Sequence, residues 1–131
     1  MSHKKSKFIL FLVLLCGMIT FSGCWKANIS IEPSSVSKIK IASGLTGDEY
    51  TIEDSTQIGE ITDMANDLHL GVGNKDNSKG YVYNIDFRDN KDSIIESFLV
   101  VDKNHINKDG YSYRRDCNKI IEYIDEIANG E

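Results

Sequence analysis

The chain reads Tyr-Val-Tyr-Asn-Ile-Asp-Phe-Arg from residue 81 to residue 88. Large apolar side chains alternate in this stretch with smaller or polar ones at a period of two, which is the spacing of a β-strand that buries one face. A turn of Asp, Asn and Lys follows at 89–92, and residues 94–101 are mostly apolar on both faces, as expected for a central strand. The sequence therefore predicts two adjacent antiparallel strands.

Shorter alternating stretches lie on both sides of these two strands. Residues 37–41 place Ile and Lys on opposite faces, and a loop with two glycines at 43–48 separates them from a second alternation at 50–53. Further along the chain, residues 105–106 are expected to form a very short strand, and tyrosines alternate with polar residues at 111–114. The short turns between successive strands favour antiparallel pairing.

Two further segments have the spacing of amphipathic helices. The first follows a capping box at 54–57, in which Asp54 accepts a hydrogen bond from the Gln57 amide. Its apolar face consists of Ile58, Ile61, Ala65 and Leu68. Residues 71–80 are rich in Gly, Asn, Lys and Asp, and we expect them to end this helix and form a mobile loop. The second helix is expected to be capped by Asp116, and its stripe consists of Cys117, Ile120, Ile121, Ile124 and Ile127.

These elements predict an α+β fold in the order ββαβββ(β)α. Two helices with one apolar face each need one sheet face to cover, so we expect a two-layer sandwich. Its antiparallel sheet has about five or six strands, with both helices on one face. The open face is expected to carry Lys38, Lys40, Thr51, Glu53, Asn84, Asp86, Arg88, Ser112 and Arg114. Such a mixture of charges indicates either a solvated surface or a partner-binding face.

The first residues differ in composition from the rest of the chain. Residues 2–7 are basic, residues 8–21 form a 14-residue apolar run, and Phe-Ser-Gly-Cys ends the segment at 21–24. A helix needs about 20 apolar residues to span a bilayer. A shorter run behind a basic start is typical of a secretory signal peptide, so we expect export from the cytoplasm.

The end of this leader resembles the processing site of bacterial lipoprotein precursors, in which a Leu-type residue and two small residues precede a Cys. Ser22 and Gly23 match the small positions and Cys24 matches the acceptor, while Phe21 stands where Leu is usual. The resemblance implies cleavage between Gly23 and Cys24, a diacylglycerol on the Cys24 thiol, and a protein anchored to the cell membrane outside the cytoplasm. A diacylglycerol supplies the two acyl chains that stable anchoring requires. An ordinary signal peptide cleaved after Ser22 and an uncleaved anchor are the alternatives.

These boundaries divide the chain into a removed signal peptide at 1–23, a lipidated cysteine with its tether at 24–36, and one α+β domain at 37–131. The 131-residue chain has a net charge of −5, which becomes −8 without the three leader lysines. A nucleic-acid partner is therefore not expected. The abundance of Ile, Asn and Lys is similar to that of small lipoproteins of low-GC Gram-positive bacteria. Cys117 has no partner cysteine, so it is either a core residue or a thiol activated at a helix start.

The sequence contains no motif that requires a catalytic residue, a metal or a cofactor. Residues 35–38 have the S-x-x-K spacing of penicillin-recognising enzymes, but the companion motifs are missing and the stretch runs from a loop into a strand. His69 and His105 lie in no zinc-binding spacing, and the aspartates at 86–92 and 102–109 fit turns better than a calcium loop. A catalytic triad assembled from residues far apart in the chain is neither excluded nor favoured by the sequence. We expect a protein that is not an enzyme.

A protein-interaction domain is the function that the remaining residues favour. Tyr and Arg are enriched at binding hot spots. Four of them lie together on the last predicted strand and its continuation: Tyr111, Tyr113, Arg114 and Arg115. We expect this strand to contact an envelope or secreted protein, as an inhibitor, immunity or accessory protein would. The alternative is a small-ligand binder that uses a groove between the helices and the aromatic strands, or the loop at 71–80.

Overall fold

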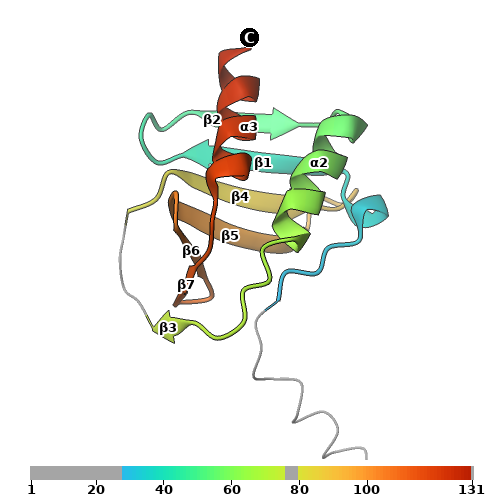
Figure 1. The fold of residues 1–131 in the computed structure, drawn as a ribbon. Helices are drawn as coiled ribbons and strands as arrows, with labels where there is room; N and C mark the ends of the chain where they lie inside the picture. The colour runs from blue at the N-terminus through green and yellow to red at the C-terminus, as the bar shows by residue number, and fades with distance from the viewer. Residues whose placement is uncertain (1–27, 76–79, 131) are drawn as a thin grey trace, which may run out of the picture.

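The structure is a computed structural model that describes residues 28–75 and 80–130, and it has the predicted α+β class. Figure 1 shows one sheet with two helices on the same face. The elements in chain order are η1 (Pro33–Ser35), β1 (Lys38–Ser43), β2 (Glu49–Ile52), α2 (Ser55–Asn66), β3 (Asn74–Lys75), β4 (Tyr83–Arg88), β5 (Ile94–Asp102), β6 (His105–Lys108), β7 (Tyr111–Arg114) and α3 (Asn118–Asn129).

The sheet has seven strands in the order β2-β1-β4-β5-β6-β7-β3, and every neighbouring pair is antiparallel. The long strand β5 lies in the middle, as its apolar character on both faces predicted. The strand pairs β1–β2, β4–β5 and β6–β7 are hairpins joined by the predicted turns. Strands β4 to β7 therefore form a meander, while the connection from β2 through α2 to β3 and the connection from β3 to β4 leave the sequential order.

The seventh strand corrects the prediction of a mobile loop from residue 71 to residue 80. Asn74 and Lys75 pair with Ser112 and Tyr111 and form β3 at the sheet edge, while residues 76–79 lie outside the described residues. A glycine permits this pairing, because a Cβ atom on Gly73 would lie 2.6 Å from the ring of Tyr113. The predicted loop is thus a strand where its backbone passes over that ring.

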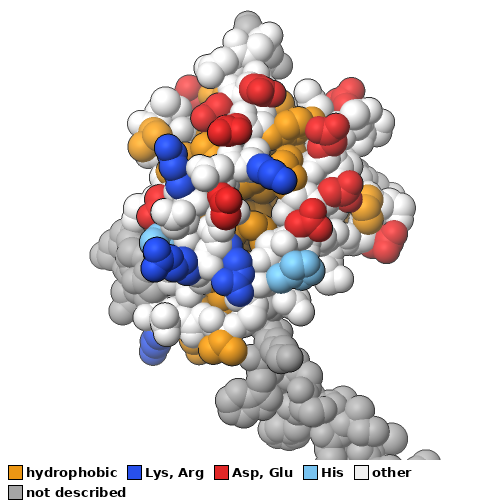
Figure 2. Space-filling model, in the orientation of Figure 1, with side chains coloured by type: hydrophobic (Ala, Val, Ile, Leu, Met, Phe, Trp, Pro, Cys, Tyr) orange, Lys and Arg blue, Asp and Glu red, His pale blue; other side chains and the backbone are white. Residues whose placement is uncertain are grey.

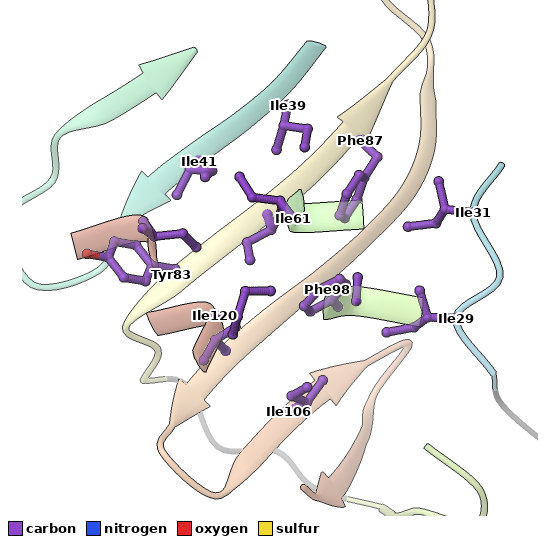
Figure 3. Close-up of a cluster of buried hydrophobic side chains, with 14 of the residues drawn as sticks. Ile29, Ile31, Ile39, Ile41, Ile61, Tyr83, Phe87, Phe98, Ile106 and Ile120 are labelled. Carbon is purple, nitrogen blue, oxygen red and sulfur yellow. The ribbon is translucent and has the colours of Figure 1, made fainter. Parts of the chain in front are cut away.

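The core lies between the sheet and the helices, where Ile and Phe side chains alternate inward as predicted. Figure 3 shows these side chains on β1, β4 and β5. The rings of Phe87 and Phe98 stack across two neighbouring strands with centroids 6.0 Å apart. The sheet residues that are almost fully buried are Ile39, Ile41, Ile85, Phe87, Phe98, Val100 and Ile106, and the helices cover them with Ile58, Ile61, Ala65, Ile120 and Ile124.

The predicted capping box of the first helix is confirmed. Asp54 is the N-cap of α2, and its side chain accepts a hydrogen bond from the Gln57 amide at 2.9 Å. The predicted cap of the second helix is wrong by one residue, because α3 begins after Cys117. Asp116 instead accepts from the Asn118 amide at 2.9 Å and closes the turn that enters the helix.

The predicted tether at 24–36 is wrong for residues 28–36, which belong to the domain. Ile29 and Ile31 are each only 4% exposed and lie beside Phe98 and Phe87 (Figure 3). The Asn66 side chain of α2 fixes this segment, since its amide donates to the Ile31 carbonyl at 2.9 Å and its oxygen accepts from the Ile31 N–H at 2.8 Å. The segment therefore completes the core layer beside the helices.

We predict that Ile31→Ala lowers the free energy of unfolding by about 2–4 kcal/mol, because it leaves a cavity against the sheet. Glu32→Ala is the matched control, since Glu32 is exposed on the same segment and should change stability by less than about 0.5 kcal/mol. Denaturant unfolding measures both. Equal stabilities of the two variants would show that the segment is not part of the core.

Candidate functional site

The predicted contact strand, β7 with the residue after it, does not form a single surface. Tyr111 is 47% exposed, whereas Tyr113 is 5% exposed and belongs to the core. Burial accordingly raises the pKa of the Tyr113 hydroxyl. Arg114 is exposed, but it falls on the opposite face of the strand from both tyrosines. Tyr111, Arg114 and Arg115 are the residues of this prediction that are exposed, and Tyr111 and Arg114 lie on opposite sides of β7.

Arg115 has a structural role that the sequence did not suggest. Its Nε donates to the carbonyl of His69 at 2.9 Å, and one Nη donates to the carbonyl of Leu70 at 3.1 Å. The other Nη donates to the carbonyl of Arg114 at 2.6 Å. His69 and Gly71 both have positive φ, so the guanidinium supports the strained turn that leads from α2 to β3. Arg115 is therefore a brace between two connections, and because it is also exposed its contact with a partner stays a prediction.

We predict that Arg115→Ala lowers the free energy of unfolding by about 1–3 kcal/mol, because the half-buried carbonyl of Leu70 and the exposed carbonyl of His69 lose charge-assisted donors. The neighbouring exposed residue provides the control, and Arg114→Ala should stay within about 0.5 kcal/mol of the wild type. Thermal or denaturant unfolding tests the difference. If Arg114→Ala is the more damaging variant, the bracing role is excluded.

The open face of the sheet carries the predicted mixture of charges, and three of these charged residues, Lys38, Asp86 and Arg88, are in ion pairs. Asp92 receives Lys38 Nζ at 3.2 Å and Arg88 at 3.4 Å, while Arg88 also contacts Asp86 at 3.4 Å. The hydrogen bond from Lys38 lowers the pKa of Asp92. Ser97 donates to the second oxygen of Asp86 at 2.5 Å. The network links β1, β4 and β5, so these polar groups hold one another in place.

Two hollows lie on this open face. One of about 200 Å³ is lined by residues of β1, β2 and β4, among them Lys40, Asp86 and Arg88. The other, of about 410 Å³, lies over β4, β5 and β6 and includes Asn84 and Asn107. Within residues 28–75 and 80–130, Arg88 Nε and Asn107 Oδ1 are buried without a hydrogen-bond partner. In addition to its ion pairs, the open face therefore has buried polar atoms that make no hydrogen bond among the described residues.

A larger groove of about 540 Å³ lies between the edge strand β2 and the C-terminal half of α3. Tyr50 and Ile52 of β2 line one side, and Tyr123, Glu126 and Ile127 of α3 line the other. A smaller groove of about 220 Å³ separates the two helices. Figure 2 shows hydrophobic side chains between the helices, acidic side chains mainly over the upper half of this face, and Lys, Arg and His side chains among and below them. The helical side of the domain is therefore partly apolar, with charges of both signs around it.

The side chains that could take part in chemistry, such as the thiol of Cys117, make contacts within the fold instead. Cys117 is 1% exposed, burial raises the pKa of its thiol to about 12, and Sγ contacts the carbonyl of Arg115 at 3.2 Å. The interpretation of Cys117 as an activated thiol is therefore wrong, and it is a core residue. His105 Nδ1 lies 2.8 Å from Asp102, and it is the backbone carbonyl of His105 that Cys117 Sγ approaches, at 3.9 Å. The described residues contain no group of three or more His, Cys, Asp or Glu side chains that could hold a metal ion.

The predicted leader sites, Gly23 and Cys24, lie outside the described residues. Within the part of the chain that the structure describes, no helix is long and apolar enough to cross a membrane. No protein-family model, curated protein or solved structure matches the chain. The fold and the surfaces described above are therefore the basis for the function proposed below.

Proposed function

We propose that the protein is a membrane-anchored lipoprotein whose domain faces outside the cytoplasm and binds another protein without catalysing a reaction. The observation that carries this proposal is the division of polar groups described above. The thiol, the Arg115 guanidinium and the Asp86–Arg88 network are all bonded within the fold, while a strand edge, a groove and an open sheet face remain. A binding module needs a shaped surface of this kind and no reactive group.

The position of the anchor agrees with such a role. Cys24 precedes the first core residue, Ile29, by five positions, which span at most about 17–18 Å even when fully extended. An anchor on Cys24 would hold the domain close to the membrane surface. The mature chain, with its net charge of −8, would be repelled by anionic headgroups, so the domain would be presented to a protein partner rather than to the lipid. The partner would be another envelope protein or a secreted one.

Small-ligand binding is the second candidate, and the hollow over Asn107 is the observation that favours it. Asn107 is 8% exposed and its Oδ1 has no partner among the described residues, so a hydroxyl or amide donor could bond to it there. The sequence suggested a ligand groove between the helices and the aromatic strands, and the 540 Å³ groove between Tyr50 of β2 and Tyr123 of α3 lies in that place. The hollow over Asn107 differs from it because it lies on the open face and contains a buried acceptor without a partner in the described part of the chain.

The anchoring part of the proposal is tested by Cys24→Ala. We expect this variant to accumulate as the full-length precursor, because lipidation of the cysteine precedes cleavage in the lipoprotein pathway that the leader resembles. Membrane fractionation and mass measurement of the product provide the readout. Cys16→Ala is the control, since this cysteine lies within the apolar run and should leave processing unchanged.

Two outcomes would contradict the proposal. A normally processed and released Cys24→Ala protein would support a conventional signal peptide cleaved after Ser22. Crosslinking of the anchored wild-type protein in intact cells should capture a specific envelope or secreted protein, and the absence of such a partner, together with binding of a small molecule, would favour the second candidate.

A further inference from the structure

The outer edge of β2 presents free backbone hydrogen-bonding groups. The N–H of Ser43 donates to the carbonyl of Asp48 at 2.8 Å, and the register pairs Ile41 with Tyr50 and Ile39 with Ile52. Bonded and non-bonded pairs alternate in an antiparallel ladder, so Tyr50 and Ile52 direct their backbone groups toward β1. Thr51 and its neighbours at 49 and 53 direct theirs outward, where no strand of the described residues lies.

The same edge forms one wall of the 540 Å³ groove. Figure 1 shows α3 crossing the sheet and extending past β2 at its C-terminal end. Beneath this part of the helix the groove is lined by Tyr50, Ile52, Tyr123 and Ile127. A strand added to β2 would therefore place every second side chain against this partly apolar wall, on the helical side of the sheet.

The charges around the groove are of one sign. Glu49, Glu53 and Glu126 line it, and none of the lining residues is Lys or Arg. The C-terminal end of α3, which carries partial negative charge, lies at the same place and has no basic residue in its last turn. Because Glu49 and Glu53 are exposed, they are free to pair with cations on an added strand.

We infer that the β2 edge binds an extended segment of a protein partner that carries two cationic residues four positions apart with apolar residues between them. This inference rests on the proposed interaction function. The cations would lie opposite Glu49 and Glu53, and the two apolar residues would lie opposite Tyr50 and Ile52. The central position faces Thr51, whose neighbour on β1 is Lys40, so an uncharged residue fits there. The recognised pattern is cation–apolar–neutral–apolar–cation.

A second copy of the chain does not fit this edge in the register that pairs Thr51 with Thr51. If two β2 strands paired about Thr51, Glu49 of each copy would lie opposite Glu53 of the other. Like charges directly opposite each other destabilise a strand pair. A basic strand replaces both repulsions with attractions, so charge selects a different protein as the partner.

The test uses the full-length, lipidated protein in detergent and a fluorescent peptide, Ser-Lys-Val-Thr-Val-Lys-Ser, with blocked ends. We expect it to bind at least about tenfold more tightly than the same peptide with Glu in place of Lys. Glu49→Lys combined with Glu53→Lys should reverse this preference. Thr51→Pro removes only an outward N–H and should weaken binding about tenfold or more, whereas Thr51→Val retains the donor and should bind like the wild type.

Equal binding of the two peptides, or unchanged binding by a folded Thr51→Pro variant, would overturn the inference. If Thr51→Pro does not fold, the charge reversal is decisive by itself. A dimer of the wild type that Thr51→Pro converts to a monomer would also overturn it, since a second copy would then occupy the edge. Partner capture in cells that survives the charge reversal but is lost in Tyr111→Ala would refute the edge inference and leave the proposed function standing.

Discussion

The burial of one face of the sheet is the constraint on which the rest of the structure depends. Strand residues alternate between two faces, so the Ile and Phe residues of β1, β4 and β5 emerge together on one side. Two helices cover most of that side, and the segment with Ile29 and Ile31 covers the area beside Phe87 and Phe98. A domain of about 100 residues is only marginally stable, so removing the contacts of the segment with Ile29 and Ile31 should destabilise the whole fold.

Covering one face leaves the other face and the edges for contacts with other molecules. The open face carries ion pairs, and edge strands need protection against pairing with identical edges. In this protein the exposed carboxylates of Glu49, in β2, and Glu53, directly after it, provide that protection. The proposed partner segment follows from the same residues, because charges that discourage self-association attract a strand of opposite sign. The negative charge of these two side chains would then both prevent self-association and select the partner.

Sequence reasoning predicted the parts of the fold that depend on local patterns. The alternation at 81–88, the central position of β5 and the cap formed by Asp54 are all consequences of residues close together in the chain. The core role of residues 29–31 was not predicted, because two isoleucines close to a proline make too short a pattern to distinguish a segment packed on the core from a tether. The strand β3 was not predicted, because a glycine such as Gly73 is typical of a loop. Only the position of the Tyr113 ring shows why a glycine is needed there.

The contact site was predicted less accurately than the fold, because it too depends on residues far apart in the chain. Tyr111 and Tyr113 share one face of β7, and their different burial depends on how far the covering elements reach along the sheet. Arg115 bonds to carbonyls 45 and 46 positions away, which no local pattern reveals. The β2 groove is formed by two segments more than 70 residues apart, so only the tertiary structure brings its acidic and apolar walls together.

The central claim is that β2 is a free edge held in a rigid sheet, and amide hydrogen exchange measured by NMR tests it most directly. In the free protein, the amides of Tyr50 and Ile52 should exchange slowly because they bond to β1, while the amide of Thr51 between them should exchange rapidly. Addition of the basic peptide should slow the exchange of Thr51 and leave its two neighbours unchanged. A protected Thr51 amide in the free protein would contradict the account, because it would show that the edge is already covered.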